Sequence, residues 1–456
     1  MNKEFKIKKK VAVAMSGGVD SAVAAARLVK AGYDCVGFHM KLWGNSNGRP
    51  GNTETLPCRQ AGLKFTETLR TARRVAKKLE IRLVVVDLRK EFKKRVVDYF
   101  CEAYGRGLTP NPCVVCNQLI KFGELLKHAR KLGCDYLATG HYARIAIEVR
   151  GSLFSKTQAG KKSGLKNHYF LLNDLPTRSS EVKSDCNLTA DQYFSKRTPL
   201  PLYHLLMARD KKKDQSYFLY RLNQEQLSHV LFPNGDYLKS EVKEMAARWG
   251  LPVKEVAESQ EICFLGGHDY REFLKDRIGN RIKGGEVVDG QGRIIGEHFG
   301  LPLYTIGQRT GFKIYHRVFG RLKNKVPVLY VIGKEVKKNR LVVGRRNEVE
   351  RREFEVKDIS WVNANYELGI KNKEFKCRIK IRNQGKLLKC KIHGERGRIR
   401  VFLEEGERGV AKGQSAVFYS KLKTQNSHLR PLKTDFGGQA KLKTDEYEVV
   451  GGGEIR

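Results

Sequence analysis

The chain has 456 residues, 40% of them hydrophobic, a length that allows two to four domains and a composition that excludes a disordered chain. It carries 88 Lys and Arg against 49 Asp and Glu, and the net charge of +39 indicates a polyanionic partner, most naturally a nucleic acid. No apolar run is long enough to cross a bilayer, which argues against a membrane protein.

The N-terminus is basic and then apolar. Its apolar stretch VAVAM is too short for the core of a secretion signal and continues directly into SGGVDS. We interpret it as a buried strand and expect a cytoplasmic protein. In that reducing compartment the ten cysteines are expected to be thiols, metal ligands or catalytic groups rather than disulfides.

Residues 11–43 are typical of a strand, a loop, a helix and a second strand. Residues 11–15 form an apolar, β-branched run suited to a parallel strand that is buried on both faces. A helix is expected over 20–32, where Gly32 ends it, and a strand over 35–43. This succession predicts a right-handed crossover in a doubly wound parallel sheet.

The loop SGGVDS, residues 16–21, joins the first strand to the helix. Its two glycines allow backbone N–H groups to point at one place, and the helix N-terminus adds partial positive charge. Ser16 and Ser21 add hydroxyl donors. The loop is neither a Walker A motif nor a GxGxxG motif. A glycine turn can be purely structural, but the complete hexapeptide between strand and helix predicts a phosphate-binding loop.

Further elements extend the same sheet. We expect helices over 64–79 and 118–132, and strands over 81–87 and 134–144. Ligands of such sheets lie beyond the carboxyl ends of the strands, which places Met40, Gly140 and His141 at the same edge as the glycine loop. Met40 is either a core residue or a cover for an adenine ring.

Residues 213–252 are predicted to be helical after their first residues. Basic and aromatic side chains alternate at their start, namely Lys213, Tyr217, Phe218, Tyr220 and Arg221. This mixture suits a nucleic-acid backbone and a flipped base, although an amphipathic core helix would show the same pattern. The polar segment 148–200 has no clear periodicity and is interpreted as a surface insert.

From about residue 285 the pattern changes to strands with glycine turns, as in GGEVVDGQGRIIGEH, VPVLYVIG and RLVVGRR. In FKCRIKIR, residues 375–382, apolar side chains alternate strictly with Lys376, Arg378, Lys380 and Arg382. Four cations on one strand face repel one another, so this row predicts contact with phosphates. The last half of the chain is therefore predicted to be a small β domain followed by a β-barrel that contacts RNA.

An ordered set of short strings resembles one family: AMSGGVDS, MKLW, TPNPCVVCN, IKFGELL, ATGHYAR, KKDQSYFL, SQEICFLG, YTIGQRTG, GQSAVFY and GGGEIR. SGGVDS is similar to the pyrophosphatase loop of the PP-loop ATPases, and the whole set resembles the tRNA-specific 2-thiouridylases of that class. The resemblance runs from residue 11 to the C-terminus, apart from stretches near 148–200 and 421–447. It implies an α/β + β protein with a doubly wound PP-loop domain over 1–255, a central linking domain over 256–350 and a tRNA-binding β-barrel over 351–456.

The resemblance also implies roles for single residues. The residues implied to bind ATP are Ala14, Met15, Ser16, Gly17, Gly18, Val19, Asp20, Ser21, Met40 and Gly140. The residues implied to face the target base are Asn111, Pro112 and Cys113. The residues implied to contact tRNA are His141, Lys213, Asp214, Gln215, Arg382, Asn383 and Gln414. Cys116 matches the family's nucleophile, and Cys263 matches the cysteine that carries a persulfide sulfur. Asn383 departs from the family pattern, which has Tyr there.

Cys113 is a second departure, because Asp is the commoner residue at this place. It creates a CxxC pair with Cys116, and Cys263 can bring a third thiol to the pair. Three cysteines leave one iron of a 4Fe–4S cluster without a protein ligand, free to hold sulfide. The alternative uses no metal: a persulfide on Cys263 attacks the base, and Cys116 then forms a disulfide with Cys263. Cys113 is then a bystander, and zinc would need a fourth ligand that the sequence does not identify.

The implied reaction is common to both routes. The O2 of a wobble uridine attacks the α-phosphate of ATP, pyrophosphate leaves, sulfur attacks C2 and AMP departs. The expected cofactors are ATP and Mg²⁺, with a 4Fe–4S cluster on the first route, and the expected partners are tRNA and a sulfur-donor protein. Another adenylating enzyme of the PP-loop class, or an RNA-binding module without catalysis, remains open as an alternative.

Overall fold

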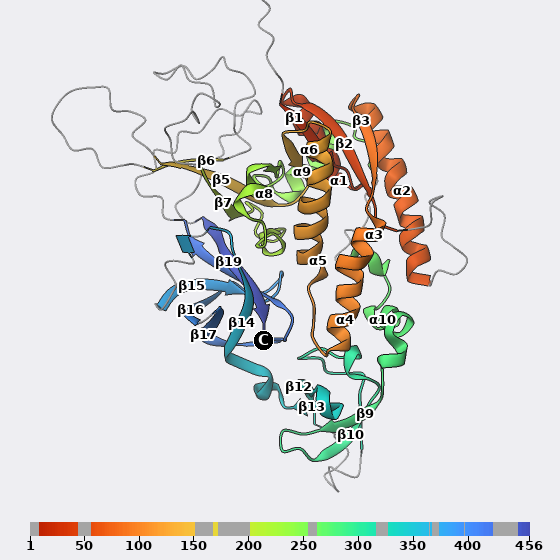
Figure 1. Ribbon diagram of the computed structural model, residues 1–456, viewed down its shortest axis with the longest axis vertical. Helices are drawn as coiled ribbons and strands as arrows, with labels where there is room; N and C mark the ends of the chain where they lie inside the picture. The colour runs from red at the N-terminus through yellow and green to blue at the C-terminus, as the bar shows by residue number, and fades with distance from the viewer. Residues whose placement is uncertain are drawn as a thin grey trace, which may run out of the picture.

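The computed structural model describes residues 9–43, 56–150, 167–171, 201–253, 262–315, 327–363, 365–366, 374–395, 397–422 and 446–456. These residues form an N-terminal α/β domain, a small central β domain and a β-barrel (Figure 1). Each of the three has a hydrophobic core. Among the residues described, no helix combines the length and the apolar character that a membrane crossing requires.

The N-terminal domain is built on a five-stranded parallel sheet in the order β3-β2-β1-β4-β8. The strands are β1 (Lys10–Ala14), β2 (Asp34–Lys41), β3 (Arg82–Asp87), β4 (Tyr136–Ala138) and β8 (Val230–Leu231). The chain moves outward from β1 to β3 and then returns to β4 on the other side of β1. This reversal of strand order confirms the predicted doubly wound sheet and puts ligands at the edge where β1 and β4 end.

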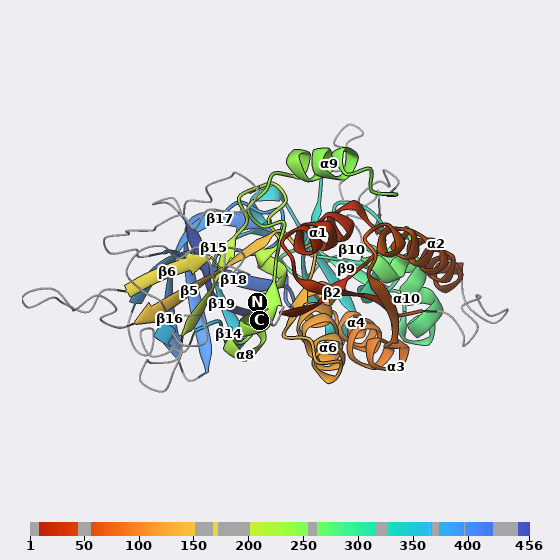
Figure 2. The same ribbon diagram turned by 90° about the horizontal axis from the view of Figure 1, so that it is seen from above.

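Helices cover both faces of this sheet. In Figure 2, α1 (Val19–Lys30) and α9 (Lys239–Arg248) lie on one side of the sheet, while α4 (Asp98–Gly105) and α6 (Leu126–Lys131) lie on the other. The long α2 (Leu56–Lys78) confirms the predicted helix there, as β3 confirms the predicted strand.

The helix predicted over 118–132 begins earlier, at Pro112, and is not uniform. It consists of α5 (Pro112–Val115), a π-helical segment η2 (Cys116–Leu125) and α6. A second π-helical segment, η1 (Lys93–Val97), joins α3 (Arg89–Phe92) to α4. Because π-helical turns are rare and are found mostly at functional sites, η2 is the unusual feature of this helix.

The prediction of one helix over 213–252 is wrong. The structure has η4 (Ser216–Phe218), α8 (Gln224–Ser228), β8 and α9 instead. The sequence FPNG breaks the run at Gly235, where a Cβ atom would lie 1.8 Å from the carbonyl oxygen of Ala143. Tyr217 and Tyr220 are fully buried in the core, so they do not form an exposed base-stacking surface.

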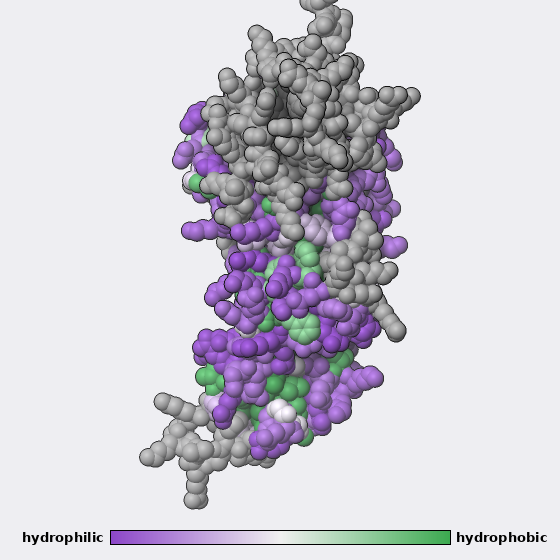
Figure 3. All heavy atoms as spheres, turned by 90° about the vertical axis from the view of Figure 1, so that its left-hand side faces the viewer, coloured by the Kyte–Doolittle hydropathy of each residue, from purple (hydrophilic) through white to green (hydrophobic). Residues whose placement is uncertain are grey.

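The central domain is a second five-stranded sheet, and its strands confirm the predicted change of pattern. Its order is β11-β10-β9-β13-β12. The strands are β9 (Gly285–Val288), β10 (Ile294–His298), β11 (Lys313–Ile314), β12 (Tyr330–Glu335) and β13 (Arg340–Gly344). Helix α10 (Tyr270–Ile278) precedes them. Four large hydrophobic side chains of this region are exposed, namely Ile294, Phe299, Val328 and Val336. The face drawn in Figure 3 is mostly hydrophilic, with some hydrophobic groups toward its lower end.

The C-terminal strands close into a six-stranded antiparallel barrel, as predicted. The order is β14-β17-β16-β15-β18-β19, and β14 also pairs with β19 to close it. The strands are β14 (Glu350–Trp361), β15 (Glu374–Lys380), β16 (Leu388–Glu395), β17 (Arg398–Arg408), β18 (Ser415–Lys421) and β19 (Tyr447–Ile455). Ile379, Ile392, Val401 and Phe418 are buried in its core.

A three-stranded extension links the barrel to the α/β domain. Strands β5 (Ala143–Arg150), β6 (Asn167–Leu171) and β7 (Leu202–Met207) follow β19 in the same sheet. β19 meets β7 at the pair Glu448 and Leu206. The end of β5 and all of β6 fall within 148–200, which the sequence pattern predicts to be an irregular insert, while most of that insert lies outside the described residues.

A buried charged cluster holds this junction together. His204 on β7 donates from Nδ1 to Glu448 on β19 (2.6 Å) and from Nε2 to Glu148 on β5 (2.9 Å). Burial alone would lower the pKa of His204, but the two carboxylates outweigh it and raise the pKa to about 9. Tyr366 donates a hydrogen bond to the second oxygen of Glu448. The imidazolium therefore bridges two carboxylates between the domains.

This cluster makes the stability of the junction depend on pH. Because the folded pKa of His204 is raised from 6.5 to about 9, its contribution is complete below pH 6.5 and is lost as the pH rises through 9. The shift corresponds to about 3 kcal/mol. We expect His204→Gln to melt below the wild type at pH 6, and the gap in melting temperature to narrow as the pH approaches 10. An equal gap at both pH values in thermal unfolding would contradict this.

Candidate functional site

The glycine loop after β1 is shaped by close contact with α2. Gly17 adopts φ +82°, and a Cβ atom there would lie 2.5 Å from the carbonyl oxygen of Thr68. Only glycine satisfies both the left-handed backbone and this contact. Gly18, by contrast, has room for a Cβ atom, which would lie 3.7 Å from Oγ of Ser16, and it forms the N-cap of α1 without a side-chain capping bond.

Ser21 holds the loop in its bent conformation. Its Oγ donates to the carbonyl oxygen of Gly18 (2.9 Å) and accepts from the backbone N–H of Ser16 (3.2 Å). The hydroxyl groups of Ser16 and Ser21 are also 3.2 Å apart. Ser16 itself is exposed, so the loop presents backbone and hydroxyl donors at the open N-terminus of α1. This arrangement is suited to an oxyanion such as a phosphate.

Gly140, at the end of β4, packs directly on this loop. A Cβ atom at Gly140 would lie 2.7 Å from the carbonyl carbon of Asp20 and 2.8 Å from the backbone nitrogen of Ser21. The fully buried Asn234 donates from Nδ2 to the carbonyl oxygen of Asp20 (2.9 Å), and its Oδ1 has no partner. The predicted neighbourhood of Gly140 and the loop is therefore observed.

The Asp20 carboxylate is anchored by two side chains. It accepts from the hydroxyl of Tyr142 (2.7 Å) and from Nζ of Lys239 (2.6 Å), the first residue of α9. Asp20 thus connects α1 to α9 and to Tyr142, the residue before β5, in addition to its predicted place in the nucleotide loop. Asn234 and Lys239 were not predicted as site residues from the sequence, because both lie in the stretch that was interpreted as one helix.

His39 on β2 is hydrogen-bonded to Met15, the residue before the glycine loop. Its Nδ1 donates to the carbonyl oxygen of Met15 (2.6 Å), and its ring lies 5.2 Å from the ring of Phe65. Burial lowers the pKa of His39 despite the opposing bond to Met15, so the ring is neutral near pH 7. The next residue, Met40, is partly buried and packs against the main core at the carboxyl end of β2.

The cysteine pair lies at the start of the helix that begins at Pro112. Asn111 is the N-cap residue, and its side chain accepts from the backbone N–H of Val114 (3.4 Å). Pro112 occupies the first helical position, where its missing N–H costs nothing. Cys113 is partly buried, and Cys116, at the start of η2, is buried. The backbone N–H of Thr109, just before this segment, donates to the carbonyl oxygen of Lys412 on the barrel (2.8 Å).

Cys263 is held against the α/β domain because its neighbour, Phe264, packs in the aromatic core. It begins η5 (Cys263–Leu265) and is exposed. Phe264 is buried, with ring centroids 5.1 Å from Phe100, 5.9 Å from Phe92 and 6.1 Å from Trp43. Aromatic packing thus fixes a residue distant in sequence against the helices of the α/β domain.

The three thiols lie close enough for each charge to influence the others. Burial first, and then Cys263, raises the pKa of Cys113 to about 11, while Lys121 opposes the rise. Burial also raises the pKa of Cys116 to about 12, again against Lys121 and with smaller contributions from Cys263 and Cys113. The two buried thiols are neutral at pH 7, and the convergence of all three remains a prediction.

Within the described parts of the chain, no three His, Cys, Asp or Glu side chains are arranged as a metal-binding group. Cys113, Cys116 and Cys263 therefore do not stand as a ligand set, although three thiolates are chemically suited to iron.

His141 has partners at both ring nitrogens. Its Nδ1 is 2.8 Å from Oγ1 of Thr139, and its Nε2 is 3.3 Å from Nζ of Lys121. Burial, and then the Lys121 charge, holds the pKa of His141 well below its usual range. The ring is therefore neutral, Nδ1 donates to Thr139, and Nε2 accepts from the Lys121 ammonium. The predicted tRNA contact of His141 remains a prediction.

Two of the residues predicted to contact tRNA serve inside the protein. Asp214 is buried and accepts from the backbone of Ala208 (2.9 Å), the hydroxyl of Ser216 (2.9 Å) and Nζ of Lys380 (3.3 Å). Its carboxylate is engaged inside the protein, and its contact with tRNA remains a prediction. Gln215 pairs with the backbone of Tyr142 through Oε1 (3.0 Å), and Lys213 is partly exposed.

The predicted row of four cations on β15 is also corrected. Lys380 is buried in the ion pair with Asp214, where it joins the barrel to the α/β domain. Arg382 is exposed and pairs with Glu407 at 2.7 Å. Oδ1 of the adjacent Asn383 is buried without a partner, and Gln414 is partly buried. The strand therefore offers phosphates fewer cations than strict alternation suggested.

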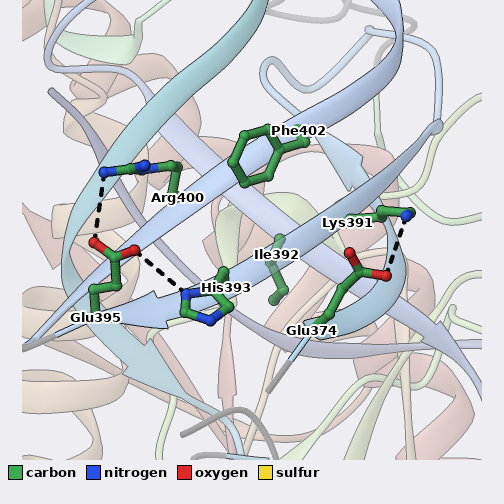
Figure 4. A pocket seen from close by; sticks show the side chains of 7 residues that line it. All are labelled: Glu374, Lys391, Ile392, His393, Glu395, Arg400 and Phe402. Carbon is green, nitrogen blue, oxygen red and sulfur yellow. Dashed lines mark ion pairs between the residues drawn. The ribbon is translucent and has the colours of Figure 1, made fainter. Parts of the chain in front are cut away.

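A shallow pocket on the barrel contains none of the predicted residues. It is lined by Glu374, Lys391, Ile392, His393, Glu395, Arg400 and Phe402 (Figure 4). Its charges pair with one another, Lys391 with Glu374 at 3.2 Å and Glu395 with both His393 and Arg400. Because these charges pair with one another, the glycine loop and the segment with Cys113 and Cys116 remain the candidate site.

Three family models match consecutive parts of the chain. The tRNA methyl transferase HUP domain matches residues 9–179 and 181–267, the tRNA methyl transferase PRC-barrel domain matches 271–345, and the aminomethyltransferase beta-barrel domain matches 351–425. In the order of the chain, these matches follow the α/β domain, the central sheet and the barrel. The first match includes Cys263.

Whole-length relatives share a common name. The tRNA-specific 2-thiouridylase of Moorella thermoacetica is 37% identical over 89% of this chain and 95% of its own length. Those of Roseiflexus sp. and Geobacter metallireducens are each 37% identical, over 90% and 91% of this chain and 96% and 94% of their own lengths. Among solved structures, the U34-tRNA thiolase of Methanococcus maripaludis with its 4Fe–4S cluster aligns with a TM-score of 0.28 at 18% identity, covering 60% of this chain and 70% of that chain.

The contact between Gly140 and the loop can be tested directly. We expect Gly140→Ala to displace Asp20 and Ser21, to destabilise the domain by about 1–3 kcal/mol and to weaken binding of an adenine nucleotide. Gly279→Ala is the matched control, since Gly279 has a helical φ of −53° and a Cβ atom there would have nothing within 4 Å. Thermal unfolding and calorimetric titration with a non-hydrolysable ATP analogue measure both effects. Equal nucleotide affinity in the two variants would exclude the loop as the binding site.

Proposed function

The chain belongs to the family of tRNA-specific 2-thiouridylases, and we propose that it replaces O2 of the wobble uridine of tRNA by sulfur, with ATP as the activating substrate. This proposal rests on the family match together with a glycine loop that suits an oxyanion and lies in the same domain as Cys113 and Cys116. A loop alone would suit many adenylating enzymes. The thiols supply the group that a uridine needs to exchange oxygen for sulfur.

Activation of the base comes first, because a pyrimidine carbonyl has no adequate leaving group at neutral pH. The uridine O2 attacks the α-phosphate of ATP, and pyrophosphate leaves. The N–H groups and hydroxyls around Gly18, Ser16 and Ser21 are placed to hold the negative phosphoryl oxygens. Mg²⁺ accompanying ATP neutralises part of the same charge. The adenylated O2 then departs as AMP.

Sulfur transfer uses Cys263 and Cys116 in turn. A sulfur-donor protein converts the exposed Cys263 to a persulfide. The terminal sulfur attacks C2, AMP leaves, and the base is joined to Cys263 through a disulfide bond. The Cys116 thiolate then attacks Sγ of Cys263, so the S–S electron pair leaves with the 2-thiouridine sulfur. An external thiol afterwards reduces the Cys116–Cys263 disulfide.

A 4Fe–4S cluster is the other sulfur source that three cysteines suggest. Cys113, Cys116 and Cys263 are suitable donors by their chemistry. Because the described side chains form no metal-binding group, we derive no step through a cluster.

The barrel gives tRNA a second point of contact near the catalytic segment. Thr109 is bonded to Lys412, and a Cβ atom at the adjacent Gly413 would lie 2.8 Å from Cβ of Leu108. Gln414 follows directly, and Arg382 reaches the surface nearby in the fold, with its NH1 3.2 Å from the place of a Cβ atom at Gly409. RNA held at this side of the barrel is thus held next to Asn111, Pro112 and Cys113.

The first experiment separates catalysis from simple RNA binding. We expect ATP and unmodified tRNA to yield pyrophosphate, and a persulfide donor to yield 2-thiouridine detected by mass spectrometry of the nucleosides. Cys116→Ala and Cys263→Ala should still release pyrophosphate but lose thiolation by about 10³-fold or more. Absence of pyrophosphate from the wild type would favour a non-catalytic RNA-binding protein. Undiminished product in both variants would favour a different adenylating reaction.

The choice between the two sulfur routes depends on Cys113. We expect Cys113→Asp, which installs the commoner family residue, to keep thiolation within about threefold of the wild type, because the persulfide route does not use this thiol. The assay is run on protein purified without oxygen, alongside its absorption spectrum and iron content. Loss of activity together with loss of iron and of visible absorbance would establish the cluster route instead.

A further inference from the structure

Two cysteines of the barrel face each other across neighbouring strands. Cys377 on β15 and Cys390 on β16 are direct partners in the antiparallel register. Their Sγ atoms lie 3.5 Å apart. Cys390 is buried, and Cys377 is partly buried. Neither thiol belongs to the glycine loop or to the segment that begins at Pro112, so this pair stands apart from the candidate site.

The side chains around the two thiols are apolar. On the neighbouring rows of the same two strands, Phe375 lies opposite Ile392 and Ile379 lies opposite Leu388. All four side chains pack in the core of the barrel. Within the described ranges of the chain, no His, Asp, Glu or further Cys joins the pair to make a metal-binding group. The chemistry that two adjacent thiols offer in such a setting is oxidation to a disulfide.

The strand pairing already brings the two backbones to a suitable separation. Residues directly opposite in antiparallel strands have Cα atoms about 4.5 or 5.5 Å apart. Both separations lie within the range of about 4.4–6.8 Å that disulfides span. Rotation of the two side chains can therefore close the gap between the sulfur atoms while β15 and β16 stay paired. A bond between Cys377 and Cys390 needs no rearrangement of the barrel.

Such a bond would close a ring around the turn between the two strands. The turn is tight, because the backbone N–H of Gly385 donates to the carbonyl oxygen of Arg382 (3.0 Å). The ring would also contain Lys380, which pairs with the buried Asp214 of the α/β domain. Arg382 pairs in turn with Glu407 on β17. The cysteine pair thus lies at the base of a hairpin that connects the barrel to its neighbours.

We propose that Cys377 and Cys390 form a reversible disulfide with low-molecular-weight disulfides as the oxidant, and that this bond fastens the hairpin turn of Arg382 and Asn383. This inference goes beyond the proposed function. The residues of the turn are the ones predicted to contact tRNA, so the bond would restrain a surface that is separate from the reacting groups.

The reaction is a two-step thiol–disulfide exchange. Cys377, the more accessible thiol, loses its proton and attacks one sulfur of the disulfide RSSR, and the first RSH leaves. Cys390 then loses its proton and attacks Sγ of Cys377, and the second RSH leaves. The two cysteines are oxidised by two electrons, and RSSR is reduced to two RSH. An excess of RSH reverses both steps.

The pair is expected to rest in the reduced form. The contact with Cys390, and then burial, raises the pKa of Cys377 well above its usual range, so this group is a thiol at neutral pH. Because the thiolate is the attacking form, exchange is slow. The pair therefore responds to a sustained excess of disulfide over thiol and not to a brief one.

The test uses the full-length protein, incubated with oxidised glutathione and afterwards with dithiothreitol. Peptide mass spectrometry identifies which cysteines are joined, and amide hydrogen exchange follows residues 381–387 in the oxidised and reduced forms. Cys377→Ala and Cys390→Ala each remove one thiol of the pair. Cys134→Ala is the matched control, because it removes a buried thiol of the α/β domain.

We expect oxidised glutathione to join Cys377 to Cys390 and dithiothreitol to separate them. Amide exchange across residues 381–387 should slow by about tenfold or more in the oxidised form, because the ring restricts opening of the hairpin. Cys134→Ala should behave as the wild type. Cys377→Ala and Cys390→Ala should show neither the bond nor the slower exchange.

The proposal is overturned if the oxidised wild type, still folded by circular dichroism, contains no bond between Cys377 and Cys390. A glutathione that stays attached to Cys377 would overturn it too, since Cys390 would then be unable to complete the exchange. A bond that leaves amide exchange at 381–387 unchanged would reject the effect on the hairpin. If a single variant fails to fold, the oxidised and reduced wild type decide the matter. None of these results depends on whether the protein forms 2-thiouridine.

Discussion

Desolvation of the cysteine pair is the constraint on which the site depends. Burial keeps Cys113 and Cys116 neutral at pH 7 and protects them from solvent, but a thiol must ionise before it attacks sulfur. The protein therefore needs a positive charge inside the same corner. Lys121, on the same helix as Cys116, lowers the pKa of both thiols against the effect of burial. Without that cation, the burial that protects the thiols would also keep them protonated and unreactive.

Buried charges of opposite sign also hold the domains together. Asp214 and Lys380 form a buried ion pair between the α/β domain and the barrel, and His204 bridges Glu148 and Glu448 across three strands. Breaking one partner of such a pair leaves an uncompensated charge in the interior, which costs far more than an exposed pair contributes. These junctions keep the barrel in register with the segment that begins at Thr109. Part of the chain's positive charge thus holds the domains together.

The predicted site and the observed site agree where local pattern and contact coincide. The loop between β1 and α1 was recognisable because a strand, two glycines and a helix follow one another without interruption. Asn234 and Lys239 were missed, although one pins the backbone of Asp20 and the other its carboxylate. Their segment has a helical distribution of apolar residues, yet Gly235 must approach Ala143 too closely for any side chain. The periodicity of apolar residues along the chain cannot predict that tertiary contact.

Strict alternation along residues 375–382 likewise predicted a row of exposed cations, and Lys380 broke it by entering an ion pair with a residue far away in the chain. Local order by itself determined the parallel sheet, the glycine loop and the strands in the last half of the chain, because each follows from residues adjacent in the chain, whereas the roles of the three cysteines came from the family resemblance. Only the tertiary structure decided that Phe264 packs against the helices of the α/β domain, that Lys239 pairs with Asp20, and that Asp214 is buried. Those outcomes rest on packing and desolvation between segments distant in sequence, and no local pattern encodes them.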